Sequence, residues 1–214
     1  MEINPADIAS SALNRILLGT VVPRPIAWVS TINEKRRPNL APFSFFNAVC
    51  TRPPTLLFCP GVRGLDGAAK DTLGNIRATG EYVINVVTQA TAEAMNKTAT
   101  ELPAEVNEFE FAGLTQAPSV RVKPPRVGES PVNFECQLRQ IVDIGDGQPG
   151  SGWIVIGEIV HLHVADEVLL PEHKIDIRAL QPVGRLAGYS YIRVNDIFEM
   201  KRLPPQIPTR KDGP

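Results

Sequence analysis

Proline constrains this chain more than any other residue type. The sequence contains 20 prolines among 214 residues, which is above average usage. Because proline lacks an N–H group and clashes with the preceding helical turn, it divides the chain into short elements and disfavours long helices. The pattern therefore favours a mostly β fold with short α insertions. At this length the chain suits one domain with a sizeable core.

An apolar hairpin near the N-terminus carries polar groups where an ordinary strand would not. Its two halves are Pro23-Arg24-Pro25-Ile26-Ala27-Trp28-Val29-Ser30-Thr31 and Asn39-Leu40-Ala41-Pro42-Phe43-Ser44-Phe45-Phe46-Asn47, joined by a charged turn. A buried polar group without a partner costs about 1–3 kcal/mol. We interpret these hydroxyls and amides as groups that a planar ligand with polar edges would satisfy.

Hydrophobic periodicity predicts the other elements. Helices are expected over 8–18, 70–80 and 88–98, and strands over 21–32, 39–49, 55–59, 82–87, 132–144 and 153–164. Asp71 or Thr72 is expected to cap the second helix and Gly80 to end it. The last two strands form a hairpin around the glycine-rich loop 145–152. One domain is expected over 1–202, followed by a proline-rich tail over 203–214.

Charge and cysteine content exclude several classes of protein. The formal net charge is −1, which argues against nucleic-acid binding. No apolar run approaches the roughly 20 residues that a membrane span needs, and the first 11 residues lack the basic region of a signal peptide. Cys50, Cys59 and Cys136 lack metal-ligand spacing. Free, buried thiols predict a cytoplasmic protein.

Two clusters could carry chemistry. Lys70-Asp71-Thr72, at a predicted helix start, and Ser30-Thr31 together suit a phosphate group. The alternative is that Lys70 is a solvated surface residue and Asp71 or Thr72 only a cap. His161 and His163 alternate on one strand and so share a face. No third ligand is evident nearby, so no metal site is predicted.

Four segments of the chain resemble one known family. They are the hairpin above, KDTLGNIRATGEYVIN, KPPRVGESPVNFEC, and GEIVHLHVADEVL followed by PVGRLAGYSY. In this order and spacing they are similar to the flavin reductase-like, FMN-binding split-barrel family, from about Leu17 to Tyr191. Two departures are the charged run 34–38, where relatives often have glycine, and Ala187, where they often have a glycine after Arg-Leu.

The resemblance implies a split β-barrel that dimerises and holds FMN between its subunits. Carried over residue by residue, the cofactor-binding residues would be Trp28, Ser30, Thr31, Asn39, Ala41, Pro42, Ser44, Phe45, Asn47, Lys70, Asp71, Thr72 and Arg185. His163 would approach the ring or the nicotinamide of the substrate. No catalytic residue is assigned, because the flavin itself carries the chemistry.

The expected function is that of an NAD(P)H-dependent flavin reductase. NADH or NADPH would be a transient electron donor, because the chain has no dinucleotide-binding fingerprint. Reduced FMN would pass to a partner monooxygenase. Two alternatives stay open: a flavoredoxin-like electron-transfer protein that retains its FMN, and a flavin-binding protein without turnover.

Overall fold

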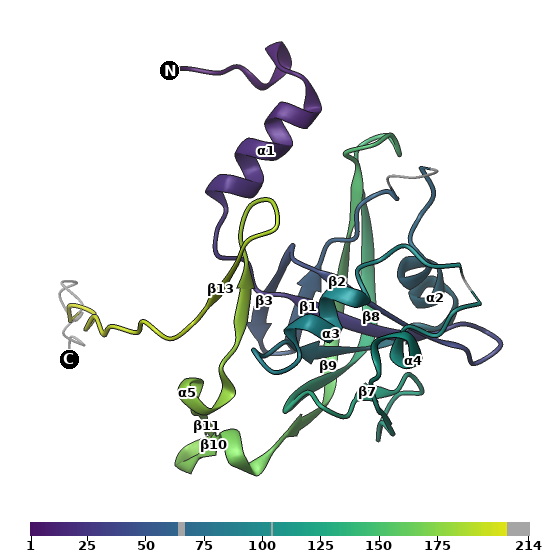
Figure 1. The fold of residues 1–214 in the computed structure, drawn as a ribbon, viewed down its shortest axis with the longest axis vertical. Coiled ribbons are helices and arrows are strands. Elements are labelled where there is room, and N and C mark those ends of the chain that lie inside the picture. The colour runs from purple at the N-terminus through teal and green to yellow at the C-terminus, as the bar shows by residue number, and fades with distance from the viewer. Residues whose placement is uncertain (64–66, 104, 205–214) are drawn as a thin grey trace, which may run out of the picture.

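A seven-stranded antiparallel sheet forms the body of the molecule in the computed structural model, which describes residues 1–63, 67–103 and 105–204 (Figure 1). Its strand order is β2-β1-β5-β8-β9-β4-β3. The strands are β1 (Ala27–Ile32), β2 (Pro38–Phe43), β3 (Phe46–Thr51), β4 (Pro54–Phe58), β5 (Glu81–Val86), β8 (Val132–Ile144) and β9 (Gly152–Val164).

The two edges of this sheet are neighbours in the sequence. Strand β2 lies at one edge and β3 at the other, yet only Ser44 and Phe45 separate them. Three residue steps span at most about 10–11 Å, so the sheet must curl until its edges nearly meet. Among the described residues no hydrogen-bonded ladder joins β2 to β3, which leaves the barrel split at this seam. The single strand expected over 39–49 is therefore wrong, because the chain turns at this corner and changes edge.

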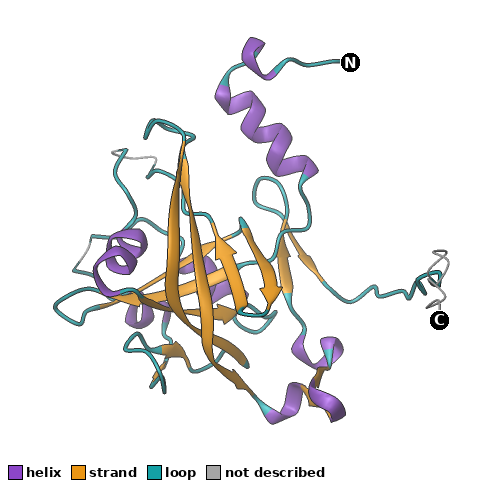
Figure 2. Cartoon of the chain, turned by 180° about the vertical axis from the view of Figure 1, so that it is seen from behind, coloured by secondary structure: helices purple, strands orange, loops and turns teal. Residues whose placement is uncertain are grey.

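The long hairpin of β8 and β9 holds the two halves of the barrel together (Figure 2). One end of β8 pairs with β5, and the middle of β9 pairs with β4. Two register shifts along the hairpin allow the strands to bend. The bounds predicted for β8 are confirmed, and those for β9 differ by one residue.

Short helices and minor strands fill the connections. They are η1 (Pro5–Asp7), α1 (Ser10–Thr20), α2 (Asp71–Thr79), α3 (Ala92–Lys97), α4 (Glu108–Ala112), β6 (Gln116–Ala117), β7 (Arg126–Val127), η2 (Asp166–Val168), β10 (Leu169–Leu170), η3 (Pro171–His173), β11 (Lys174–Ile175), α5 (Ile177–Leu180), β12 (Val183–Arg185) and β13 (Tyr191–Arg193). The mostly β fold with α insertions is confirmed. No helix in the described ranges is long and apolar enough to cross a bilayer.

Strand β1 is buried along its whole length because it lies between two hydrophobic cores. Ala27 and Val29 face the barrel core, which α2 covers, whereas Trp28 packs in a second core with α3 and α4. Gly80 ends α2 with a φ of 70°, as predicted. The expectation that all three cysteines are buried is confirmed only for Cys136, since Cys50 is exposed on β3 and Cys59 is half-buried.

The first helix and the C-terminal arm extend away from the barrel (Figures 1 and 2). No residue of α1 is buried, and the arm from residue 194 to 204 is exposed throughout its described length. Of the proline-rich tail predicted over 203–214, only Leu203 and Pro204 lie within the described residues.

Candidate functional site

Six of the residues singled out from the sequence line one pocket between β2 and the start of α2. They are Asn39, Ala41, Pro42, Lys70, Asp71 and Thr72. The edge strand β2 contributes its half-buried side chains to this pocket, whereas its buried residues Leu40 and Phe43 point into the cores. Arg63, the loop 98–102 and Glu108 complete the lining. The fold therefore brings together two motifs that lie about thirty residues apart in the sequence.

The start of α2 combines a lysine with backbone N–H groups that no side chain caps. Lys70 occupies the N-cap position and no side chain caps the helix, so N–H groups of the first turn are open to a ligand. The Lys70 ammonium lies 5.3 Å from the centre of the Phe43 ring. Burial lowers the pKa of Lys70, and nearby Glu101 opposes that change. A partly desolvated cation beside an uncapped helix N-terminus suits a phosphate.

Carboxylates share this pocket and set its electrostatic balance. Asp71 is paired with Arg63, with 3.2 Å between Oδ1 and Nη2. Glu108 accepts the Leu40 N–H at 3.2 Å, and burial raises the pKa of Glu108. Glu101 is exposed on the loop after α3. A phosphate would therefore compete with Glu101 for the lysine.

The Thr72 hydroxyl links α2 to β2 and does not face the opening of the pocket. Its Oγ1 accepts a hydrogen bond from Asn39 Nδ2 at 3.0 Å, and the residue is only 1% exposed. Asp71 and Thr72 do not cap the helix, so that expectation is wrong. Lys70, Asp71 and Asn39 are consequently the polar side chains of these motifs that keep exposed surface in the pocket.

Trp28, Ser30 and Thr31 have no exposed surface. The Ser30 hydroxyl donates to the carbonyl of Pro125 at 2.5 Å, and Thr31 Oγ1 accepts from Asn75 Nδ2 at 3.0 Å. Their polar groups are satisfied by the protein itself, so the interpretation that they need a ligand is wrong. The Trp28 indole N–H likewise donates to a threonine hydroxyl, that of Thr98. Direct contact between these residues and a flavin finds no support in this geometry.

Ser44, Phe45 and Asn47 lie at the corner where the barrel is split and do not line the pocket. Phe45 is 46% exposed, which leaves an aromatic face open beside the seam. Asn47 is exposed on β3 and uses its Oδ1 to accept the Ala48 N–H at 2.8 Å. The corner offers an apolar surface and amide groups, which suit the faces and edge of a flat ring.

A buried arginine holds this corner in place. Arg24 is 4% exposed, and its guanidinium donates to the carbonyls of Leu18 and Val21 at 2.9 and 2.7 Å. It also donates to the Leu186 carbonyl at 2.9 Å and to Ser44 Oγ at 3.4 Å. One side chain thus connects the end of α1, the corner and the segment after β12. The sequence showed Arg24 inside a motif but gave no signal of this role.

Arg185 lies beside Arg24 and not in the pocket. The two residues pair through their backbones, with N–O distances of 3.0 and 2.8 Å. The Arg185 guanidinium stacks over the Tyr191 ring at 4.4 Å and donates to the Gly188 carbonyl at 2.5 Å. Arg185 could close the flavin site, as predicted, only if the bound flavin extended beyond this pocket.

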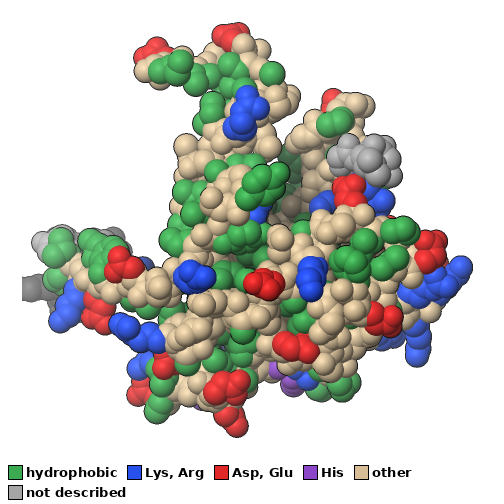
Figure 3. All heavy atoms as spheres, in the orientation of Figure 1, with side chains coloured by type: hydrophobic (Ala, Val, Ile, Leu, Met, Phe, Trp, Pro, Cys, Tyr) green, Lys and Arg blue, Asp and Glu red, His purple; other side chains and the backbone are tan. Residues whose placement is uncertain are grey.

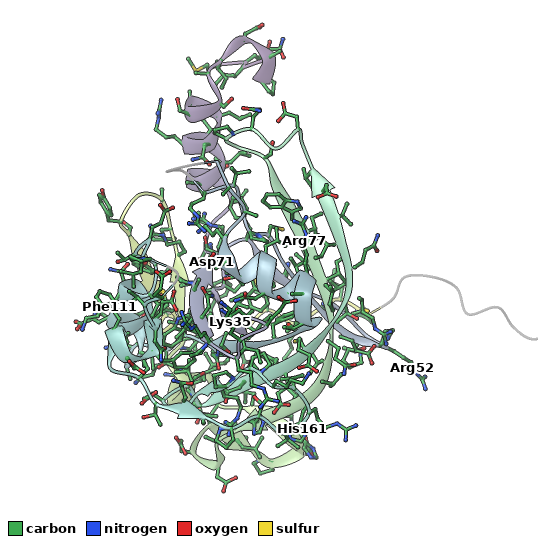
Figure 4. The ribbon with its side chains drawn as sticks, turned by 90° about the vertical axis from the view of Figure 1, so that its right-hand side faces the viewer. Lys35, Arg52, Asp71, Arg77, Phe111 and His161 are labelled. Carbon is green, nitrogen blue, oxygen red and sulfur yellow. The ribbon has the colours of Figure 1, made fainter. Side chains whose placement is uncertain are left out.

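His163 lies on β9 with Glu135, apart from the pocket at α2. Its Nε2 is 2.5 Å from Glu135 Oε1, and neither residue lines the pocket. Figure 4 shows the neighbouring His161 at the end of the molecule away from Asp71. His163 is therefore not part of the pocket at α2, and its approach to the flavin ring or the nicotinamide stays a prediction. Sequence reasoning also missed Arg63, whose pairing with Asp71 gives no periodic signal.

Comparison with known proteins shows what the whole chain is similar to. The flavin reductase like domain model matches residues 18–176. An uncharacterised protein of Halalkalibacterium halodurans is 40% identical over 204 residues, covering 94% of this chain and 96% of the relative. Nitrilotriacetate monooxygenase component B from Bacillus cereus superposes with a TM-score of 0.88 at 31% identity, covering 94% and 98% of the two chains.

A third similar protein has a different named activity. The 2-nitrobenzoate 2-nitroreductase NbaA of Pseudomonas fluorescens superposes with a TM-score of 0.85 at 29% identity, covering 98% and 100% of the two chains. The domain match covers well over half of this sequence. The chain therefore belongs to the flavin reductase-like family of split-barrel proteins, and the resemblance drawn from its motifs is confirmed.

Replacing Ser30 tests whether its hydroxyl serves the fold or a ligand. In Ser30→Ala the Pro125 carbonyl loses its donor, so we expect the unfolding free energy of flavin-free protein to fall by about 1–3 kcal/mol. Ser11→Ala, on the exposed face of α1, is the control and should change it by less than about 0.5 kcal/mol. Urea denaturation measures both. Unchanged flavin-free stability with weakened flavin binding would contradict this assignment.

Proposed function

We propose that this chain is an FMN-binding, NAD(P)H-dependent flavin reductase that passes reduced flavin to a partner monooxygenase. The observation that carries the proposal is the pocket at the start of α2. There a partly desolvated lysine and open helix N–H groups face an edge strand, in a chain of the flavin reductase-like family.

The residues present fit the two ends of FMN. Lys70 and the first turn of α2 would hold the phosphate, because the positive end of the helix and the ammonium both favour an anion. Ala41 and Pro42, with the corner at Ser44 and Phe45, would support the ribityl chain and ring. When bound, FMN supplies hydride acceptance from a nicotinamide and onward electron transfer. The pocket holds about 100 Å³, which is too small for a whole flavin but suits a terminal phosphate. FMN is proposed over FAD because the sequence has no dinucleotide-binding fingerprint for an adenine half.

The same small volume supports a site completed by a second copy of the chain. Pockets for small molecules usually enclose about 300–1,000 Å³, so one chain encloses only part of a flavin. Apolar side chains also lie exposed along α1 and the C-terminal arm (Figure 3); Leu17 is 46%, Phe198 79% and Met200 82% exposed. Exposed apolar surface of this kind marks interaction sites. We therefore propose a homodimer.

The nicotinamide and the electron acceptor follow from the same proposal. NADH or NADPH would bind transiently over the flavin, because the motifs of a separate dinucleotide-binding domain are missing from the sequence. A monooxygenase as acceptor is supported by the name of the Bacillus cereus neighbour. Three free cysteines suit a reducing cytoplasm.

Anaerobic addition of nicotinamide tests the activity. We expect protein loaded with FMN to lose its oxidised flavin absorbance when NADH or NADPH is added, and to reduce further FMN catalytically. Ultrafiltration after reduction then separates exchange from retention. Catalytic turnover with flavin in the filtrate supports a reductase. Reduction only by a protein donor, with flavin retained, would overturn it in favour of an electron carrier.

Two charge changes should move FMN affinity in opposite directions. Lys70→Gln removes the cation and should weaken FMN binding roughly tenfold or more, because a hydrogen bond to a charged group contributes about 1.5–3 kcal/mol. Glu101→Gln removes the competing carboxylate and should tighten it. Fluorescence titration measures both, with riboflavin as the ligand that lacks a phosphate. Equal losses for FMN and riboflavin in Lys70→Gln would contradict a phosphate contact.

Light scattering tests the homodimer directly. We expect the flavin-free protein to have twice the mass of one chain at micromolar concentration. Replacing Leu17 and Phe198 with Glu should lower that mass and weaken FMN binding together, since the site would lose its second half. A monomer that binds FMN tightly would contradict the shared site.

A further inference from the structure

Two strands bring three metal-ligating side chains to one place outside the flavin pocket. Glu135 of β8 pairs with His161 of β9, and His163 pairs with Asn133. Side chains alternate across a strand, so Glu135, His161 and His163 share one face of the hairpin. Their ligand atoms all lie within 4.8 Å of one another. The third ligand that the sequence alone does not reveal thus comes from the neighbouring strand, twenty-six residues before His161.

We propose that Glu135, His161 and His163 form a binding site for a divalent transition-metal ion, with Zn²⁺ the ion that their chemistry suits best. Two imidazoles and one carboxylate are a common three-residue ligand set for zinc, with a fourth position left for water or another small ligand. None of the three lines the pocket at α2. The proposal therefore does not depend on flavin binding.

The carboxylate is already oriented toward the histidines. The N–H of Val120 donates to Glu135 Oε1 at 2.7 Å, and those of Arg121 and Val122 donate to Oε2 at 2.5 and 3.2 Å. One lone-pair direction of Oε1 remains, and it points at His163 Nε2, 2.5 Å away. Backbone donors of this kind fix a metal-ligating carboxylate and are typical of the surroundings of metal sites.

A zinc ion fits this arrangement after a small adjustment. Zinc binds nitrogen and oxygen ligands at about 2.0–2.2 Å, which separates neighbouring ligand atoms of a tetrahedron by about 3.3–3.5 Å. The ion would take the place of the proton shared by Glu135 and His163 and push the two groups apart by less than about 1 Å. The two imidazole rings, 4.8 Å apart between centroids, would then close on the ion from one side.

Access and charge both suit a cation. Glu135 has no exposed surface, whereas both histidines are half-buried, so an ion would enter from the histidine side. A divalent ion would also compensate the buried carboxylate. The nearby cation is Arg126, which is directed away, toward Asn133 Oδ1 at 3.0 Å and the Pro118 carbonyl at 3.1 Å.

Zinc titration of the chelator-treated protein tests the site, with matched histidine variants. His161→Gln removes one ligand but keeps the bond between Glu135 and His163, so the variant should fold. His173→Gln, on the exposed η3 turn, is the control. Isothermal titration calorimetry with ZnCl₂ should give one ion per chain in the wild type and in His173→Gln. His161→Gln should bind at least tenfold more weakly, and zinc should raise the melting temperature of only the first two proteins.

Two outcomes would overturn the proposal. In the first, the wild type binds no zinc, and zinc changes the melting temperature of none of the three proteins. Glu135 and His163 would then be a hydrogen-bonded pair that anchors the loop at 120–122. The second is zinc binding that His161→Gln leaves unchanged, which would assign it to another group such as the exposed Cys50. Co²⁺ provides an independent readout, because a tetrahedral site containing His161 should give an intense visible spectrum that the variant lacks.

Discussion

The short link between β2 and β3 is the constraint on which the rest of this structure depends. Two residues, Ser44 and Phe45, connect the opposite edges of a seven-stranded sheet. Such a link can be made only if the sheet curls through nearly a full turn. The long β8–β9 hairpin makes that curl possible, because it pairs with β5 on one side and with β4 on the other. The link thus brings the two edges of the sheet together, and among the described residues only the missing ladder between β2 and β3 leaves the barrel split.

That corner also lies beside the surfaces that we propose for the flavin. On one side of it, β2 carries the lining of the pocket that α2 completes. On the other, β3 is exposed along nearly all its length. Arg24 connects the corner to α1 and to the segment after β12 through one buried guanidinium. Because α1 contributes nothing to the core of its own chain, this arginine would link the flavin site to the surface on which we place the second copy.

The sequence predicted β4, β5, β8 and β9 to within one residue, because their signals are local, but it began β1 six residues too early. The alternation of apolar and polar residues predicted β8, and the glycine-rich loop predicted the turn that follows it. Gly80 marked the end of α2. It did not predict the corner, because the polar residues Ser44 and Asn47 were interpreted as ligand-binding groups and not as a break where the strand changes edge. It also did not show that the hydroxyls of Ser30 and Thr31 already have partners, since nothing local indicates that Pro125 and Asn75 satisfy them. The pairing of Arg63 with Asp71 and the approach of Glu135 to two histidines arise only from tertiary contacts.

Lengthening the corner tests this account most directly. An insertion of two glycines between Ser44 and Phe45 would relax the link between the sheet edges, while a longer loop by itself costs the fold little. The same insertion between Gly147 and Gln148, in the exposed β8–β9 loop, is the control. The account predicts that only the corner insertion weakens FMN binding, roughly tenfold or more, with the flavin-free protein still folded. Unchanged FMN affinity in a folded corner variant would contradict the claim that this link positions the flavin site.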